Sequence, residues 1–113
     1  MRTKPTADFA SFDALDIRVG RILEVEEAQT RKPTYRLLSD LGHEIGSKRS
    51  CAALRNYSRE SLVGQQVICV VNFAPKKMGP ETSEVLVLGV PNPTGETILL
   101  TPQHPVELGV RVF

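Results

Sequence analysis

The chain has 113 residues, of which 41% are hydrophobic and 24% are charged. This length and composition exclude a disordered chain and a two-domain protein, and they predict a single globular domain over residues 1–113. The net charge of +1 is far below that of proteins that coat nucleic acid. No apolar run reaches the roughly 20 residues of a membrane span, and the first residues lack a signal-peptide core, so we expect a cytoplasmic protein without membrane insertion.

The first half of the chain predicts one short helix and three strands. Apolar residues at three-residue spacing predict an amphipathic helix over residues 8–15. Residues 16–28 alternate in polarity and predict a long strand, and a glycine inside it, Gly20, predicts a bulge or bend there. We then expect a loop at 29–34, a strand at 35–42, a turn at 43–46 and a strand at 47–54.

The second half predicts a helical turn followed by short strands. The turn begins at Ser58 and ends at Gly64. Residues 65–73 form the most apolar segment and predict a central strand. A rigid, non-helical loop is expected at 74–80, because this stretch holds two prolines and a glycine. We also expect strands at 83–90, 97–102 and 109–113, with a turn at 91–96.

Many short strands with regularly spaced turns are typical of a small barrel or sandwich, and the bent first strand favours a barrel. The helical turn between the third and fourth strands matches the helix that closes one end of an OB-fold. We therefore expect an all-β, five-stranded OB-fold barrel with a short N-terminal helix and a C-terminal strand extension.

The basic residues include three adjacent pairs, which we expect to converge on one face of the barrel. They are Arg31–Lys32, Lys48–Arg49 and Lys76–Lys77. In an OB-fold the loops after the first and fourth strands flank a ligand groove beside the second and third strands. Each pair is also compatible with an ordinary solvated segment.

Two further residues are candidates for this groove. Tyr35 has two interpretations, which are a stacking platform for a base and a core residue with its hydroxyl at the surface. Met78 is flexible and polarisable, so it can cover apolar groups of many shapes. A groove with such residues suits unpaired nucleotides or an unfolded polypeptide.

The sequence predicts no enzymatic activity, no metal and no cofactor. His43 and His104 are isolated in turns, and no glycine-rich phosphate loop is present. Cys51 and Cys69 lie in apolar stretches and are interpreted as small buried residues.

Several segments together resemble the tRNA-binding OB-fold domain of aminoacyl-tRNA synthetases and their cofactors. They are DIRVG, RKPTYRLLSDLG, LVGQQVICVVNFAPKKMGPETSEVLVLG and GVRVF. Within that superfamily the chain is similar to the free-standing CsaA-type proteins, which are described as secretion chaperones. The resemblance implies a cytoplasmic homodimer that binds unfolded or precursor polypeptides and assists export, with trans-acting tRNA binding as the alternative. It also implies that Ser83 and Glu84, with Lys77 and Met78, belong to the ligand groove.

The chain ends are predicted to form a dimer interface. The helix over 8–15 is too short to be stable alone, and the segment over 103–113 leaves an apolar edge that must be covered. Exchange of these ends between two chains would bury both. The predicted interface residues are Phe9, Phe12, Leu15, Val110, Val112 and Phe113.

Overall fold

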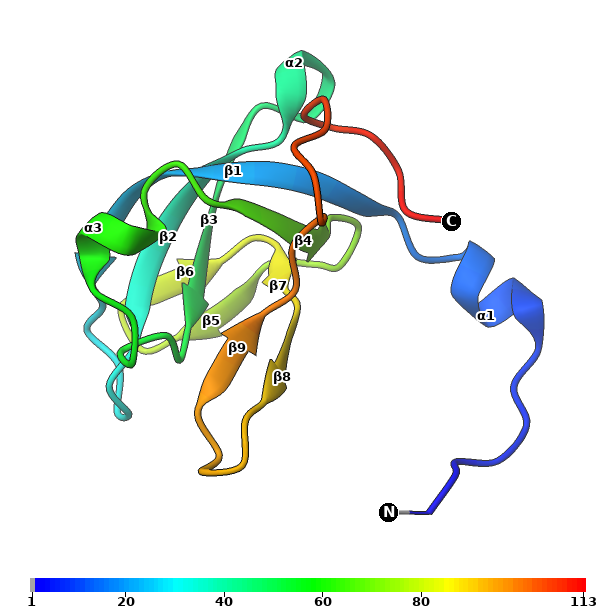
Figure 1. The fold of residues 1–113 in the computed structure, drawn as a ribbon, viewed down its shortest axis with the longest axis horizontal. Helices are drawn as coiled ribbons and strands as arrows, with labels where there is room; N and C mark the ends of the chain where they lie inside the picture. Colours follow the sequence, from blue (N-terminus) through cyan, green and yellow to red (C-terminus); the bar gives the residue numbers. More distant parts are fainter. Residues whose placement is uncertain (1) are drawn as a thin grey trace.

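The computed structural model describes residues 2–113, and five strands form its central antiparallel sheet. The order across the sheet is β3–β2–β1–β4–β7. The sheet curls into a nearly closed barrel (Figure 1), so the predicted five-stranded barrel is confirmed. The bounds are β1 (Ile17–Glu27), β2 (Tyr35–Asp40), β3 (Ser47–Ala52), β4 (Gln66–Val70) and β7 (Leu86–Val87).

β1 is irregular, but the irregularity is not at Gly20 as predicted. The pairing of β1 with β2 shifts register between Ile22 and Glu24, whereas Gly20 pairs in regular register with β4. A Cβ atom on Gly20 would lie 2.7 Å from Cδ2 of Leu41. Gly20 therefore makes room for a core side chain, and the bulge lies three residues further along, at Leu23.

The core fills the barrel with alternate side chains of the strands, and α3 (Arg59–Leu62) closes one end. Ser58 caps this helix, because its side chain accepts a hydrogen bond from Ser61 N at 3.2 Å. Leu62 is fully buried. The predicted helical turn between the third and fourth strands is confirmed.

Three other segments differ from the prediction. A short helix, α2 (Gly42–Ile45), replaces the turn at 43–46. The expected loop at 74–80 belongs to a hairpin of β5 (Lys76–Met78) and β6 (Glu81–Ser83), because Gly79, at φ 65°, and Pro80 make a tight turn. The expected strand at 83–90 is wrong, since the chain leaves the barrel after β7 and forms a separate hairpin of β8 (Gly89–Pro91) and β9 (Thr97–Leu99) (Figure 1).

The C-terminal segment is not the strand that the sequence predicted. Among residues 2–113 it forms a single isolated bridge, between Arg111 and Arg18, and Gly109 two residues earlier has a φ of 87°. The Arg18 guanidinium donates to Gly109 O at 3.0 Å. Backbone hydrogen bonds still cover the first residues of β1: Val19 N to Val110 O (3.1 Å), Gly109 N to Val19 O (2.8 Å) and Val112 N to Ile17 O (2.8 Å).

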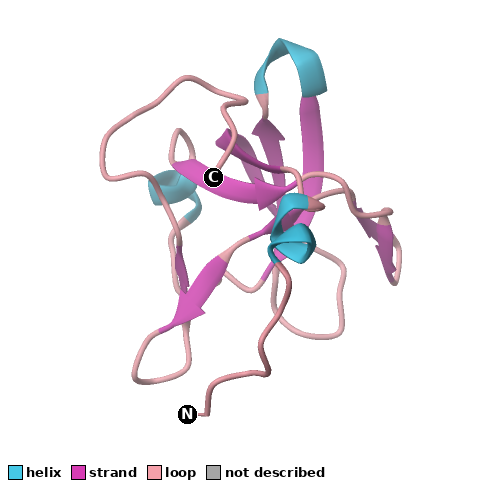
Figure 2. Cartoon of the chain, turned by 90° about the vertical axis from the view of Figure 1, so that its right-hand side faces the viewer, coloured by secondary structure: helices cyan, strands magenta, loops and turns pink. Residues whose placement is uncertain are grey.

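α1 (Phe9–Asp13) projects from the barrel on the same side as the C-terminal segment (Figures 1 and 2). None of its residues is buried, and its two aromatic rings contact each other with centroids 5.8 Å apart. The predicted helix is therefore present, but in the single chain it lacks a packing surface. Across residues 2–113, no helix has the length and apolar character needed to cross a membrane.

Candidate functional site

An open groove of about 530 Å³ lies over the outer face of β1, β2 and β3, and the β5–β6 hairpin forms one wall. A second hollow of about 420 Å³ extends it along β3. This is the surface on which OB-folds bind extended ligands. The first hollow is lined by Glu24, Glu26, Arg36, Leu37, Leu38, Arg49, Pro80, Glu81 and Thr82.

Ser83 and Glu84 attach the hairpin to the edge of β3. The Ser83 hydroxyl accepts from Cys51 N at 3.2 Å and donates to Val85 O at 3.1 Å. Glu84 N donates to Arg49 O at 2.8 Å, and the Glu84 carboxylate accepts from Arg49 N at 2.9 Å. These bonds satisfy backbone groups that an open sheet edge would leave unpaired. The structure therefore gives both residues a part in building the groove wall.

Glu81 attaches the other end of the hairpin, and sequence reasoning missed it. Its carboxylate accepts from Gln29 N at 2.9 Å and from the Arg36 guanidinium at 3.0 and 3.1 Å. The hydrogen bond from Gln29 N, followed by that from Arg36, lowers the pKa of Glu81, and Glu81 raises the pKa of Arg36. The Gly-Pro pair that precedes Glu81 is the sequence signal that could have located it, because it indicates a hairpin turn, and such a turn places Glu81 opposite Met78.

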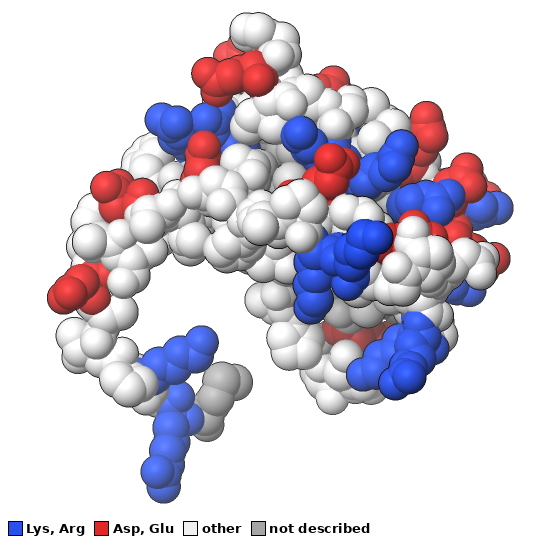
Figure 3. Space-filling model, turned by 180° about the vertical axis from the view of Figure 1, so that it is seen from behind, with Lys and Arg blue, Asp and Glu red and all other residues white. Residues whose placement is uncertain are grey.

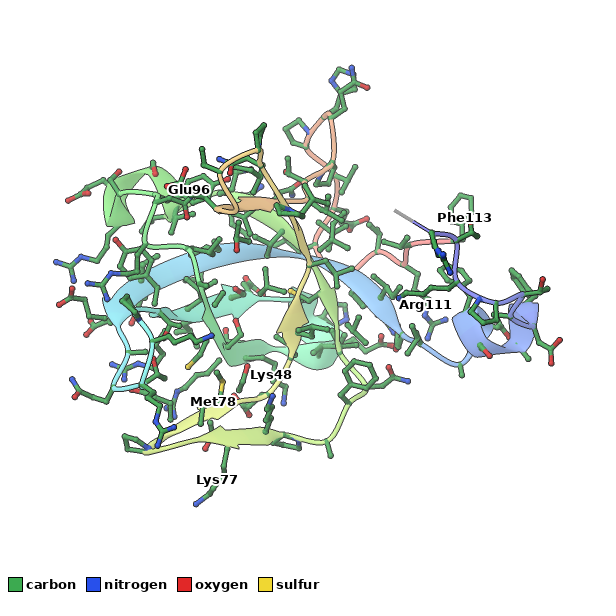
Figure 4. The ribbon with its side chains drawn as sticks, turned by 90° about the horizontal axis from the view of Figure 1, so that it is seen from below. Lys48, Lys77, Met78, Glu96, Arg111 and Phe113 are labelled. Atoms are coloured by element: carbon green, nitrogen blue, oxygen red, sulfur yellow. The ribbon has the colours of Figure 1, made fainter. Side chains whose placement is uncertain are left out.

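The basic pairs do not converge on the groove as pairs. Successive strand residues point to opposite faces, so each pair on a strand contributes one residue to a given face. Arg49 lines the groove, whereas Lys48 pairs with the buried Ser39 and lies on the other face of β3. In Figure 4, Lys77 points away from the molecule and Met78 toward it.

Arg31 and Lys32 are exposed in the loop between β1 and β2. Among residues 2–113, none of the six paired basic residues takes part in an ion pair, whereas Arg36 and Arg55 do. On the face of the barrel seen in Figure 3, basic side chains are interleaved with acidic ones and do not form one continuous basic surface.

Tyr35 lies in the core, so it does not offer a stacking surface in the groove. Its side chain is buried, and its hydroxyl donates to Tyr57 O at 2.9 Å. The Arg55 guanidinium lies 5.2 Å from the ring centroid. Of the two interpretations the structure has the core residue, with its hydroxyl bonded inside the protein.

A mainly apolar hollow of about 410 Å³ lies on the other side of the hairpin. Phe73 and Leu86 line it and are each 48% exposed, and Met78 lies beside them. Lys76 provides a charge at this hollow. Sequence reasoning missed Phe73 and Leu86, because the predicted strands at 65–73 and 83–90 include them. The remaining lining residues are Cys51, Ala74, Ser83, Glu84 and Val85.

The predicted interface residues mostly come together. Phe9, Phe12, Leu15, Val112 and Phe113 line a hollow of about 640 Å³ between α1 and the C-terminal segment. Val110 lies outside this hollow and is 38% exposed. Residues 2–113 contain no group of three His, Cys, Asp or Glu side chains that could hold a metal ion.

Comparisons with known proteins agree with this fold. The chain is similar to the CsaA chaperone of Picrophilus torridus, with 39% identity, a TM-score of 0.91 and coverage of 96% of this chain and 100% of that one. It is also similar to chaperone CsaA of Bacillus anthracis, with 39% identity, a TM-score of 0.90 and coverage of 96% of this chain and 99% of that one.

The chain is also 34% identical to methionine–tRNA ligase of Archaeoglobus fulgidus over 99% of its length, but it spans only 17% of that ligase. The family described as "Putative tRNA binding domain" matches residues 17–111. With most of its length matched and with the OB-fold barrel of its structural neighbours, the chain belongs to the tRNA-binding domain family.

Proposed function

We propose that the protein is an export-related molecular chaperone that binds unfolded or precursor polypeptides. The observation that carries this proposal is the apolar hollow beside the groove, where Phe73, Leu86 and Met78 offer surface to an apolar side chain. Burial of apolar area is the main source of affinity for an unfolded chain. Similarity to two proteins described as CsaA chaperones supports the assignment. A cytoplasmic location is part of this proposal.

Trans-acting tRNA binding is the second candidate. The membership of the tRNA-binding domain family favours it, as do the paired basic residues that carry no ion-pair partner among residues 2–113. Phosphate contacts release counterions, so each contact contributes a slope of roughly −0.7 to −0.9 to log K against log salt. Affinity for tRNA should then fall steeply with salt.

A salt titration of both ligands separates the two functions. The ligands are total tRNA and a reduced, carboxymethylated unfolded protein, and the variants are Lys76→Ala with Lys77→Ala, and Met78→Ser. For the chaperone, Met78→Ser should weaken polypeptide binding about tenfold, and the double lysine change should matter less. Val90→Ser is the matched control, because Val90 is 46% exposed but lies on β8, outside the hollow.

The outcome that contradicts the chaperone function is tight, steeply salt-dependent tRNA binding with no measurable affinity for the unfolded protein. In that case the double lysine variant should flatten the tRNA slope by about 1.5. Equal effects of Met78→Ser and Val90→Ser on polypeptide binding would show that the apolar hollow is not the polypeptide-binding site.

The proposed functional form is a homodimer. Phe9 is 75% exposed and Phe12 is 39% exposed, next to the exposed apolar residues Val112 and Phe113. An isolated five-residue helix is not stable in water, so α1 requires a surface to pack against. A second chain that provides the same ends would cover this surface symmetrically.

A further inference from the structure

Arg36, a cation that lines the groove, is already paired with a carboxylate of the protein itself, that of Glu81. Both carboxylate oxygens of Glu81 accept from one guanidinium nitrogen of Arg36, Nη1, at 3.0 and 3.1 Å, and one of them also accepts from Gln29 N at 2.9 Å. The Glu81 side chain is 7% exposed and that of Arg36 is 36% exposed. Arg36 therefore faces the groove with its charge neutralised from within.

A carboxylate and a phosphodiester are both anionic acceptors for a guanidinium, so a carboxylate already paired with Arg36 reduces the attraction that a phosphate would gain there. A phosphate that took the Nη1 donor of Arg36 would have to displace Glu81. That displacement would leave a buried carboxylate without its charged partner, which is strongly unfavourable. With Glu81 in place the Arg36–Glu81 pair has no net charge, so Arg36 gives a phosphate little electrostatic attraction.

The rest of the groove has the same bias. Glu24 and Glu26 line it together with Glu81, and only Arg36 and Arg49 oppose these three carboxylates. Glu26 also lies 3.6 Å from Arg36. The Arg49 charge is the one guanidinium of this groove that has no carboxylate ion pair among residues 2–113.

We propose that Glu81 is a specificity-determining residue that disfavours the phosphodiester backbone in the groove by neutralising Arg36. The inference rests on the proposed function, since it reserves the groove for a ligand without phosphates, such as a polypeptide. Glu81 also holds the hairpin against the loop between β1 and β2. A purely structural role predicts that its substitution lowers stability and weakens every ligand alike.

The test measures binding of a labelled oligouridine by fluorescence anisotropy over a series of salt concentrations. The proteins are the wild type, Glu81→Gln, Arg36→Gln and the double variant. Glutamine keeps an oxygen that can accept from Gln29 N but loses the charge that neutralises Arg36. Glu96→Gln is the matched control, because it makes the same charge change in the turn between β8 and β9, far from Met78 in Figure 4.

Glu81→Gln should bind oligouridine roughly tenfold more tightly at low salt, with a slope steeper by about 0.7, which corresponds to one added phosphate contact. The double variant should lose this gain. Arg36→Gln alone should leave the wild-type slope unchanged, since its charge is already neutralised. Glu96→Gln should change affinity less than about twofold, because Glu96 lies in the turn between β8 and β9 and does not line the groove.

The inference is overturned if Glu81→Gln gains no more than Glu96→Gln, if neither binds oligouridine, or if the double variant keeps the gain. If Glu81→Gln lacks a cooperative urea transition, two single variants that keep Glu81, Arg36→Gln and Arg49→Gln, are compared instead for the salt dependence of oligouridine binding. Arg49→Gln should then reduce the slope by about 0.7 and Arg36→Gln should not, and equal reductions would overturn the inference.

The same proteins are titrated with the carboxymethylated unfolded protein, which separates the two proposals. A gain in oligouridine binding without any polypeptide binding would refute the chaperone function and leave the role of Glu81 intact. Polypeptide binding without the gain would refute the role of Glu81 alone.

Discussion

Replacing Gly20 with valine tests the packing between β1 and the end of β2. A Cβ atom at this position would lie 2.7 Å from Cδ2 and 3.2 Å from Cγ of Leu41, and 3.1 Å from the backbone oxygen of Asp40. Leu41 is fully buried, so it cannot move without disturbing the core. The backbone of Gly20 is not in the left-handed region, and the expected cost is therefore steric.

Overpacking a well-packed core typically costs about 1–3 kcal/mol, and we expect Gly20→Val to lower the free energy of unfolding by this amount. Leu41→Ala alone should cost about 2–5 kcal/mol, because it leaves a cavity. In the double variant the alanine removes the atoms that valine would meet. The combined loss should therefore be smaller than the sum of the single losses by at least about 1 kcal/mol.

The measurement is urea unfolding of the four proteins at one fixed protein concentration, because association shifts the apparent stability. Free-energy losses that add within about 0.5 kcal/mol would refute the steric contact. An unchanged urea midpoint for Gly20→Val would show that β1 accommodates a side chain at this position.

Three further predictions concern the dimer, the pairing of Asp16 with Arg18, and the cysteines. Light scattering should give twice 12.5 kDa for the wild type and a single chain mass for Phe12→Asp, and a monomeric wild type would contradict the dimer. The hydrogen bond from Arg18 lowers the pKa of Asp16 in the folded protein. The stabilisation that ionised Asp16 contributes is therefore complete above its ordinary pKa of 3.8 and is lost as the pH falls through the lower pKa of the folded protein. Asp16→Asn should make the urea midpoint depend less on pH in acid. The same pH dependence in the wild type and the variant would contradict this linkage. Burial raises the pKa of Cys69 to about 12 and also raises that of Cys51, so at pH 8 a thiol reagent should label the half-buried Cys51 slowly and Cys69 only after unfolding. Rapid labelling of Cys69 in folded Cys51→Ala protein would refute its burial.

The barrel was predictable because its signals are local. The alternation along β1 and the cap and stop signals at Ser58 and Gly64 each depend on a few neighbouring residues. Such patterns survive in the folded chain when the burial of one face agrees with them. The same alternation could not locate the bulge at Leu23, because a register shift depends on the partner strand.

The site was less predictable because its geometry comes from pairings between distant segments. Ser83 and Glu84 have their structural role only where β6 meets β3, and Glu81 only where the hairpin meets Arg36. The placement of Lys48 and Arg49 on opposite faces follows from strand geometry once β3 is recognised as regular through both residues. A rule that treats adjacent charges as one patch therefore fails on strands.

The contact between the C-terminal segment and β1 has a consequence for the way the chain folds. Arg18 and Gly109 are 91 residues apart, and the pairing at Ile17 and Val19 needs residues as late as Val112. Loop closure over such a distance costs entropy before any contact is gained, which slows folding relative to helical proteins of the same size. During synthesis, the outer edge at the start of β1 stays unpaired until almost the whole domain has been made. A protein proposed to protect unfinished chains thus presents, while it is being translated, the kind of open strand edge on which other chains aggregate.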